Sequence, residues 1–143
     1  MAITSAICNS FKQEILEAEH NFTASTGNTF NLALYDSDAT LNKSTTVYTT
    51  SEELATTGGY TAKGNALTSV TPVLDSDTAV CDFSNSSWTS ASFTARGCLI
   101  FNDSHSSDAA VCSIDFGGDK TVTSGTFTVE FPAAAASTAI IQI

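Results

Sequence analysis

The sequence predicts a mostly β fold, an antiparallel two-sheet sandwich of about eight short strands with one amphipathic helix near the N-terminus. Apolar and polar residues alternate in many short segments, which is the period of a strand with one buried and one solvated face. Serine and threonine supply 41 of the 143 residues, and they suit turns and solvated strand faces. At this length we expect a single domain, residues 1–143, with its own core.

The stretch from Ala110 to Phe131 shows the strand pattern most clearly. Residues 110–116 and 126–131 each alternate between apolar and polar side chains, and Gly117, Gly118 and Asp119 lie between them. Glycine reaches the positive φ values of tight turns, so this spacing predicts an antiparallel hairpin with its turn at the glycines. The proline that follows Phe131 has no N–H for a sheet and should end the second strand.

The N-terminal region predicts the helix, over residues 4–20. Ile7, Phe11, Ile15 and Leu16 fall at helical spacing, with polar residues elsewhere on the wheel. Thr4 or Ser5 could cap its start. Such an apolar stripe needs a surface to cover it, either a sheet or a neighbouring subunit. We therefore take Ile7, Phe11, Ile15 and Leu16 as the candidate assembly residues.

Other segments predict further strands and turns. The apolar run at residues 98–101 indicates a central strand covered on both faces. Residues 50–53 match a capping box and predict a short helical turn, and residues 102–108 have the composition of a polar turn. The remaining expected strands are residues 30–35, 66–73 (at a sheet edge because of Pro72), 78–83, 88–95 and 139–143.

The charge balance argues against nucleic acid as a partner. Fifteen acidic residues outweigh five basic ones, giving a net charge of −10, and such a surface repels a phosphate backbone. No stretch has the length and hydropathy of a membrane span. The start of the sequence lacks the basic and apolar regions of a signal peptide, so we expect cytoplasmic synthesis. The four cysteines form no C-x-x-C pair and are expected to be buried free thiols, with a disulfide as the alternative.

No residue pattern predicts catalysis, a cofactor or a metal site. There is no G-x-S-x-G, no Walker A and no G-x-G-x-x-G sequence, so we expect that the protein is not an enzyme. Asp103, His105 and Asp108 could bind a metal, but their spacing matches no defined motif and favours a solvated loop. The Asp-x-Asp pairs at 36/38 and 75/77 could bind calcium, but without an EF-hand loop they favour turns.

Segments along almost the whole chain carry a family resemblance. The opening Ile3–Ile15 contains Asn-Ser-Phe-Lys-Gln-Glu and is followed by His-Asn-Phe at residues 20–22. Further matching segments are residues 30–35, 39–41, 59–62, 88–93, 95–97, 115–121, 127–132 and 139–141. In this order they resemble a family of small structural proteins of tailed bacteriophages, common in aquatic phages.

The resemblance implies a virion structural protein made in the host cytoplasm, and it supplies no catalytic residues. We expect a capsid decoration or cement protein that docks on the major capsid protein and stabilises the shell. The alternative is a tail, collar or fibre component that binds another tail protein or a host-surface glycan. A small sandwich with an apolar helix stripe also predicts a symmetric homo-oligomer, with a trimer as the first expectation.

Overall fold

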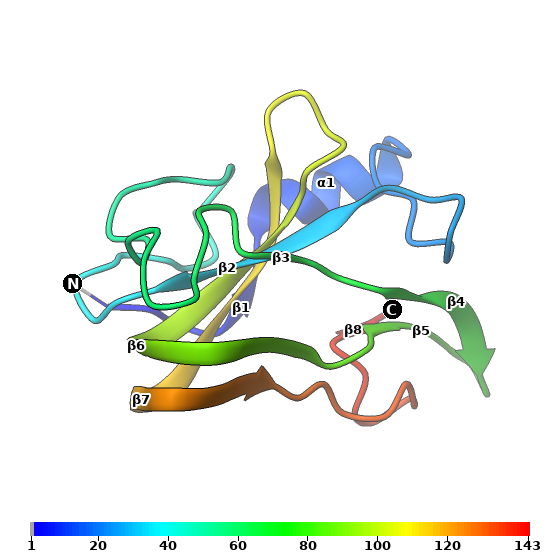
Figure 1. Cartoon of the computed structure of the whole chain (residues 1–143). Helices are drawn as coiled ribbons and strands as arrows, with labels where there is room; N and C mark the ends of the chain where they lie inside the picture. The colour runs from blue at the N-terminus through cyan, green and yellow to red at the C-terminus, as the bar shows by residue number, and fades with distance from the viewer. Residues whose placement is uncertain (1) are drawn as a thin grey trace.

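The computed structural model describes residues 2–143 and contains two antiparallel sheets and one short helix (Figure 1). The elements are β1 (Ala6–Ile7), α1 (Asn9–Leu16), β2 (Phe30–Tyr35), β3 (Asn65–Ala66), β4 (Ser69–Asp75), β5 (Thr78–Phe83), β6 (Ser86–Asn102), β7 (Ala109–Val129) and β8 (Ile141–Gln142). One sheet has the strand order β1-β7-β6-β2-β3, and the other has the order β4-β5-β8. The predicted fold class, mostly β with two sheets and an N-terminal helix, is confirmed.

A long hairpin of β6 and β7 dominates the structure, and it corrects the predicted hairpin at the glycines. Residues on both sides of Gly117 belong to one strand, β7, which pairs with β6 from Ala109 to Val129. The turn lies instead at residues 103–108, where the polar composition predicted one. Similarly, the two strands predicted over residues 88–95 and 98–101 are parts of the single strand β6.

The glycines form a bulge rather than a turn. Ala95 pairs with Lys120 and Gly97 pairs with Asp115, so Arg96 alone lies opposite residues 116–119 of β7. Gly117 has a φ of +77°, which explains why glycine suits this position. The Arg96 guanidinium lies 3.2 Å from Asp115, which precedes the bulge, and 3.7 Å from Asp119, the last residue of the bulge. The extra residues bend the hairpin, as the course of β6 and β7 in Figure 1 shows.

The bend divides the hairpin into two arms. We call residues 97–102 with 109–115 the core arm and residues 86–95 with 120–129 the outer arm. The core arm lies beside β2, and residues 98–102 are fully buried, which confirms the predicted central strand. The outer arm alternates between buried or half-buried and exposed side chains along most of its length. Both arms belong to the five-stranded sheet, but only the core arm pairs with β2, and the bend turns the outer arm away from it.

The helix is shorter than predicted. α1 begins at Asn9, because Ala6 and Ile7 pair with β7 as strand β1. The Ser5 hydroxyl accepts the N–H of Asp115 instead of capping the helix. Cys8 holds the N-cap position without a side-chain hydrogen bond, and the chain leaves the helical conformation by Ala18, whose φ is +62°.

The capping box at residues 50–53 does not start a helix. Its glutamate, Glu53, accepts hydrogen bonds from the hydroxyls of Tyr48 and Tyr60 and from the backbone N–H of Lys63. Burial, followed by the hydrogen bond to Glu53, raises the pKa of both tyrosines. Three donors on one carboxylate connect distant parts of the long segment between β2 and β3, so tertiary contacts override the local helix signal.

The remaining strands follow the predictions with small shifts. β2 and β5 have the predicted bounds. The strand predicted over residues 66–73 is divided into β3 and β4, and Pro72 lies in β4 at the edge of its sheet, as expected. The strand predicted over residues 139–143 is shortened to β8. In β5, Cys81 and Phe83 are buried, whereas Ala79 is exposed.

Candidate functional site

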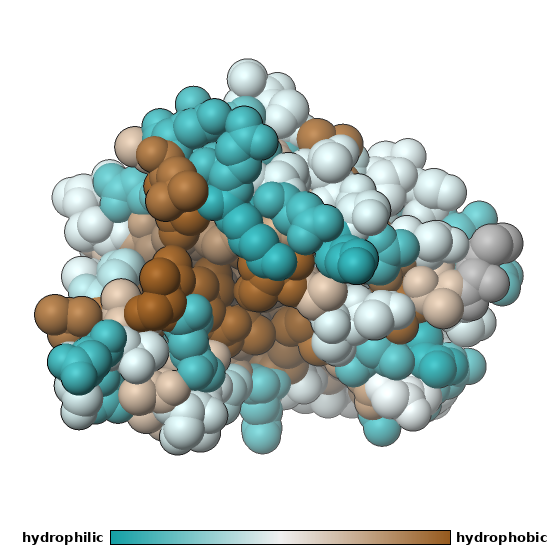
Figure 2. Space-filling view, turned by 180° about the vertical axis from the view of Figure 1, so that it is seen from behind, coloured by the Kyte–Doolittle hydropathy of each residue, from teal (hydrophilic) through white to brown (hydrophobic). Residues whose placement is uncertain are grey.

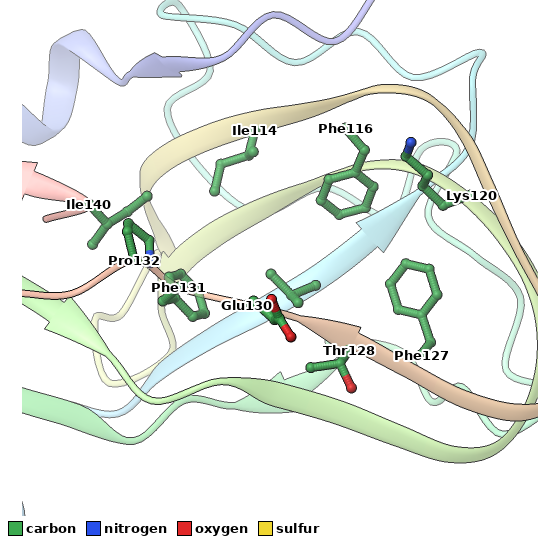
Figure 3. A pocket seen from close by; sticks show the side chains of 10 residues that line it. Ile114, Phe116, Lys120, Phe127, Thr128, Glu130, Phe131, Pro132 and Ile140 are labelled. Carbon is green, nitrogen blue, oxygen red and sulfur yellow. The ribbon is translucent and has the colours of Figure 1, made fainter. Parts of the chain in front are cut away.

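The bend of the hairpin opens an apolar pocket of about 510 Å³ beside β7. Ile114 and Phe116 reach it from one side of the bulge, and Phe127 and Val129 reach it from the other (Figure 3). The segment after β7 completes the walls with Phe131, Pro132 and Ile140, and Lys120, Thr128 and Glu130 contribute the polar part of the lining. The pocket is therefore formed mainly by one strand folded back towards itself.

Aromatic rings hold the mouth of the pocket in shape. The Phe116 and Phe127 rings lie 6.2 Å apart between centroids, one on each side of the bend. Phe127 also packs 5.1 Å from Phe93 and 6.1 Å from Trp88, inside the outer arm. Such tilted and edge-to-face contacts are favourable for aromatic pairs. The pocket wall is thus anchored in the core and is not a set of free surface side chains.

Three smaller hollows continue this pocket along the same face. The first pocket shares Ile114 and Ile140 with a hollow under β1, which shares Ile7 with a hollow between α1 and β8. That hollow shares Ile15, Ile141 and Ile143 with one beside β5. Figure 2 shows apolar surface gathered in a hollow on this side. We call the whole feature the apolar groove, defined by Ile7, Ile15, Leu16, Ile114, Phe116, Phe127, Val129, Ile140, Ile141 and Ile143.

The four candidate assembly residues meet at one end of the apolar groove. Ile7, Phe11, Ile15 and Leu16 all line the hollow between α1 and β8. They come from two elements, because Ile7 lies in β1, and their burial differs. Phe11 is 2% exposed and is a core residue, whereas Leu16 is 88% exposed. Phe11 packs 4.9 Å from the His20 ring and 5.9 Å from the Phe22 ring. The predicted stripe therefore combines a core anchor with a freely accessible leucine.

The sequence reasoning missed the β7 part of the groove. It assigned Phe116, Phe127 and Val129 to the buried faces of two strands, and all three are half-buried. The feature of the sequence that could have indicated this pocket is Gly-Gly-Asp at residues 117–119, between two segments of alternating apolar residues. A bulge there turns both faces towards one hollow, whereas a tight turn would have stacked them on one flat sheet face.

His20 is a buried structural residue. Its Nε2 lies 2.8 Å from Glu14 Oε2, and its Nδ1 lies 3.1 Å from Asn102 Nδ2. The Asn102 amide donates to Nδ1, so Nε2 carries the proton and donates to the carboxylate. Helix α1 ends before His20, which therefore does not lie at the helix C-terminus as expected. With no exposed side-chain surface, the imidazole is closed to a substrate.

The possible metal site at residues 103–108 is occupied by a lysine. Lys63 Nζ lies 2.9 Å from a carboxylate oxygen of Asp103 and 2.9 Å from one of Asp108. His105 points elsewhere, with Nε2 3.4 Å from Glu19 Oε2. Hydrogen bonds to the two carboxylates raise the pKa of Lys63, so the ammonium is held in its charged form. Two of the three candidate ligands, Asp103 and Asp108, are thus arranged around a cation that the chain itself supplies.

The Asp-x-Asp pairs are arranged as turn residues. Asp36 Oδ1 accepts the N–H of Asp38 at 2.9 Å, which is an Asx turn. Glu52 joins this pair, so three carboxylate oxygens lie within 4.8 Å of one another. Asp75 Oδ2 accepts the N–H of Ala136 at 2.7 Å and connects β4 to the C-terminal segment. Independence from calcium stays a prediction for both pairs.

The four thiols are free and buried, as the sequence predicted. Desolvation raises the pKa of Cys8 to about 11 and that of Cys81 to about 12, and it raises the pKa of Cys98 and Cys112 as well. A thiol reacts through its thiolate, so these groups are poor nucleophiles at neutral pH. The cysteines therefore act as small apolar core residues.

Comparisons with known proteins complete the description of the site. A scan against protein-family models, a search of curated proteins and a search of solved structures each found no match to this chain. The phage origin therefore stays a prediction from the sequence segments. Among the described residues 2–143, no helix is long and apolar enough to cross a membrane.

Proposed function

We propose that this chain is a structural protein of a tailed-phage virion. In this proposal it is a capsid decoration protein that docks on the major capsid protein through the apolar groove and stabilises the shell. The groove is the observation that carries the proposal. Surface apolar patches of this kind mark interaction sites in water-exposed proteins. The ordered resemblance to phage structural proteins supplies the particle as the setting.

The arrangement of the polar groups supports binding rather than chemistry. In the described part of the chain, the His20 side chain has no exposed surface and the four thiols are buried, although Cys81 and Cys112 border hollows of the groove. Lys120 and Glu130 are the ionisable groups in the lining of the first pocket. An apolar hollow bordered by a few charges is suited to hold another protein surface.

Leu16 provides a sharp test, because it is exposed and contributes little to the fold. We expect Leu16→Glu to place a charge in the docking surface and to reduce incorporation of the protein into particles. Leu74→Glu is the matched control, since Leu74 is 74% exposed on β4 and lies outside the groove. Both variants should keep the melting temperature of the native protein, which circular dichroism can check.

Electron microscopy of the particles decides the location. Hundreds of copies over the shell would support decoration, whereas a few copies at one vertex would place the protein in the tail, the alternative partner. Equal incorporation of Leu16→Glu and Leu74→Glu would contradict docking through the groove. The symmetric homo-oligomer, with a trimer as the first expectation, stays a prediction that light scattering can test independently.

A further inference from the structure

β7 has a free edge beside the apolar groove. On one side β7 pairs with β6 along its length, and on the other it pairs with β1 only at Cys112 and Ser113. Among residues 2–143, no strand pairs with that second side beyond Ser113. The sandwich is therefore open there, and the first pocket of the groove lies at the opening.

Residues 121–129 contain no charged residue and no proline, and four of the nine are threonine. The strand is irregular there, because its pairing with β6 shifts register between Val122 and Phe127 and Ser124 has a φ of +46°. Residues 127–129 keep an unbroken register with β6. The edge strand β4 differs, because Pro72 interrupts its pattern of backbone donors. Natural proteins commonly protect free edges with charges, proline or a covering segment. A free edge without charge or proline, beside an apolar hollow, is suited to strand addition by a binding partner.

The groove and the free edge share residues. Phe127, Thr128 and Val129 belong to the edge and also line the pocket. Side chains of a strand alternate between two faces. A strand added beside β7 would therefore direct every second side chain into the groove, between Phe116 on one side and Ile140 on the other.

The occupant that fits best is a segment of another protein rather than a second copy. A second copy would bring together two chains of net charge −10. Two of the five basic residues are already in ion pairs with aspartates, Lys63 with residues 103 and 108 and Arg96 with residues 115 and 119. The acidic excess therefore favours a basic partner.

We propose that an extended segment of a partner protein, apolar at alternate positions and basic between them, adds as a strand to the free edge of β7. Its apolar side chains fill the groove, and its backbone pairs with residues 121–129. The inference rests on the proposed docking function and specifies how docking occurs. It does not depend on which virion protein supplies the segment.

A synthetic peptide of about nine residues, the length of a typical strand, tests this directly. Valine alternates with lysine in the probe. One control has the same charge but carries proline at its centre, and a second control replaces every lysine with glutamate. We expect the probe to bind the full chain about tenfold more tightly than the proline control, because proline removes a backbone donor and breaks the strand. The glutamate peptide should bind still more weakly.

Hydrogen exchange locates the bound probe. Amides in residues 121–129 should become protected when the probe binds, while those of β4 should not. Ile140→Ser should weaken binding of the probe, and Leu74→Ser is the matched control outside the groove. Glu130→Lys gives a second variant that changes only an exposed side chain, and it should also weaken binding.

The outcomes separate this inference from the proposed function. Equal binding of the probe and the proline control, or no binding up to about 1 mM, would overturn strand addition. Protection at β4 instead of β7 would also overturn it. These results would leave a decoration role intact if particles still carried the protein over the shell. Strand addition by the probe would stand even if the particles placed the protein in the tail.

Discussion

The two arms of the β6–β7 hairpin have different surroundings. In the core arm, the run from Cys98 to Phe101 is fully buried between β2 and β7. In the outer arm, the free edge of β7 exposes alternate side chains and borders the apolar groove. One continuous pair of strands therefore supplies the centre of the fold at one end and a binding surface at the other. The bulge at Gly117 separates the two roles.

The strongest test of this comparison is a matched pair of phenylalanine substitutions. Phe101 in the core arm is fully buried and stacks on Tyr48 with ring centroids 4.7 Å apart. We expect Phe101→Ala to lower the free energy of unfolding by about 3–5 kcal/mol. Phe127→Ala in the outer arm should lower the free energy of unfolding clearly less, because Phe127 is only half-buried. Urea unfolding of both variants measures the difference, and equal losses would contradict the division into two arms.

The thiols provide a second test, through reaction rates. In the native protein, Cys98 and Cys112 of the core arm should react with a thiol reagent about a hundredfold more slowly than a cysteine introduced by Thr126→Cys, because labelling requires local opening. Thr126 is an exposed residue of the outer arm.

Denaturation without reductant is the control for the labelling experiment. All four native cysteines should then react, since the structure keeps them free. Recovery of two reactive groups or none would reveal a disulfide. Fast labelling of Cys98 in the native protein would show that the core arm opens readily.

Substituting the glycines of the bulge should change the stability of the protein by a smaller amount. A Cβ added at Gly117 or Gly118 meets no atom within 4 Å, so the two positions differ mainly in backbone conformation. Gly117 has a positive φ, which disfavours residues with a Cβ, and Gly117→Ala should cost about 1–2 kcal/mol. Gly118→Ala should change stability by less than about 0.5 kcal/mol. A thermal unfolding series compares them, and the same loss at both positions would contradict the role given to Gly117.

The smallest expected effect comes from the charge beside the bulge. The hydrogen bond from the N–H of Gly117, followed by the Arg96 guanidinium, lowers the pKa of Asp115. A carboxyl whose folded pKa is lowered adds stability above its unfolded pKa of about 3.9, and that stability is lost as the pH falls through the folded value.

Asp115→Asn keeps an oxygen acceptor but removes this charge. The variant should be slightly less stable than the native protein at pH 7, and this deficit should be smaller near about pH 3, below the unfolded pKa of about 3.9. Melting temperatures at the two pH values measure the change. A deficit that persists unchanged at the acidic pH would assign the effect to something other than the charge.

The sequence predicted what depends on local pattern. The alternation in β7, the apolar run of β6 and the bounds of β2 and β5 all follow from side-chain period and β propensity. The predicted assembly residues also meet at one hollow. In each case the information lies within a few neighbouring residues.

What the sequence did not predict depends on distant partners. Gly117 signals a positive φ, but whether it makes a turn or a bulge depends on which strand lies opposite, and that strand begins at Ser86. Ala6 and Ile7 fit a helix until β7 is available to pair with them. Glu53 looks like a helix cap, yet two tyrosine hydroxyls bind it in the folded protein. Long-range pairing decided each of these positions.

The pairing of β1 with β7 has a consequence for how the protein is made. Ala6 pairs with Ser113, and β2 needs the residues up to Asn102 before its second edge is paired. A ribosome that adds about 5–20 residues per second exposes the apolar β2 segment for seconds before those partners emerge. Non-local strand pairing is also slow, on a scale of milliseconds to seconds. During this interval the nascent chain presents an unpaired strand that can aggregate, so yield in the cell should depend on chaperones and on growth temperature.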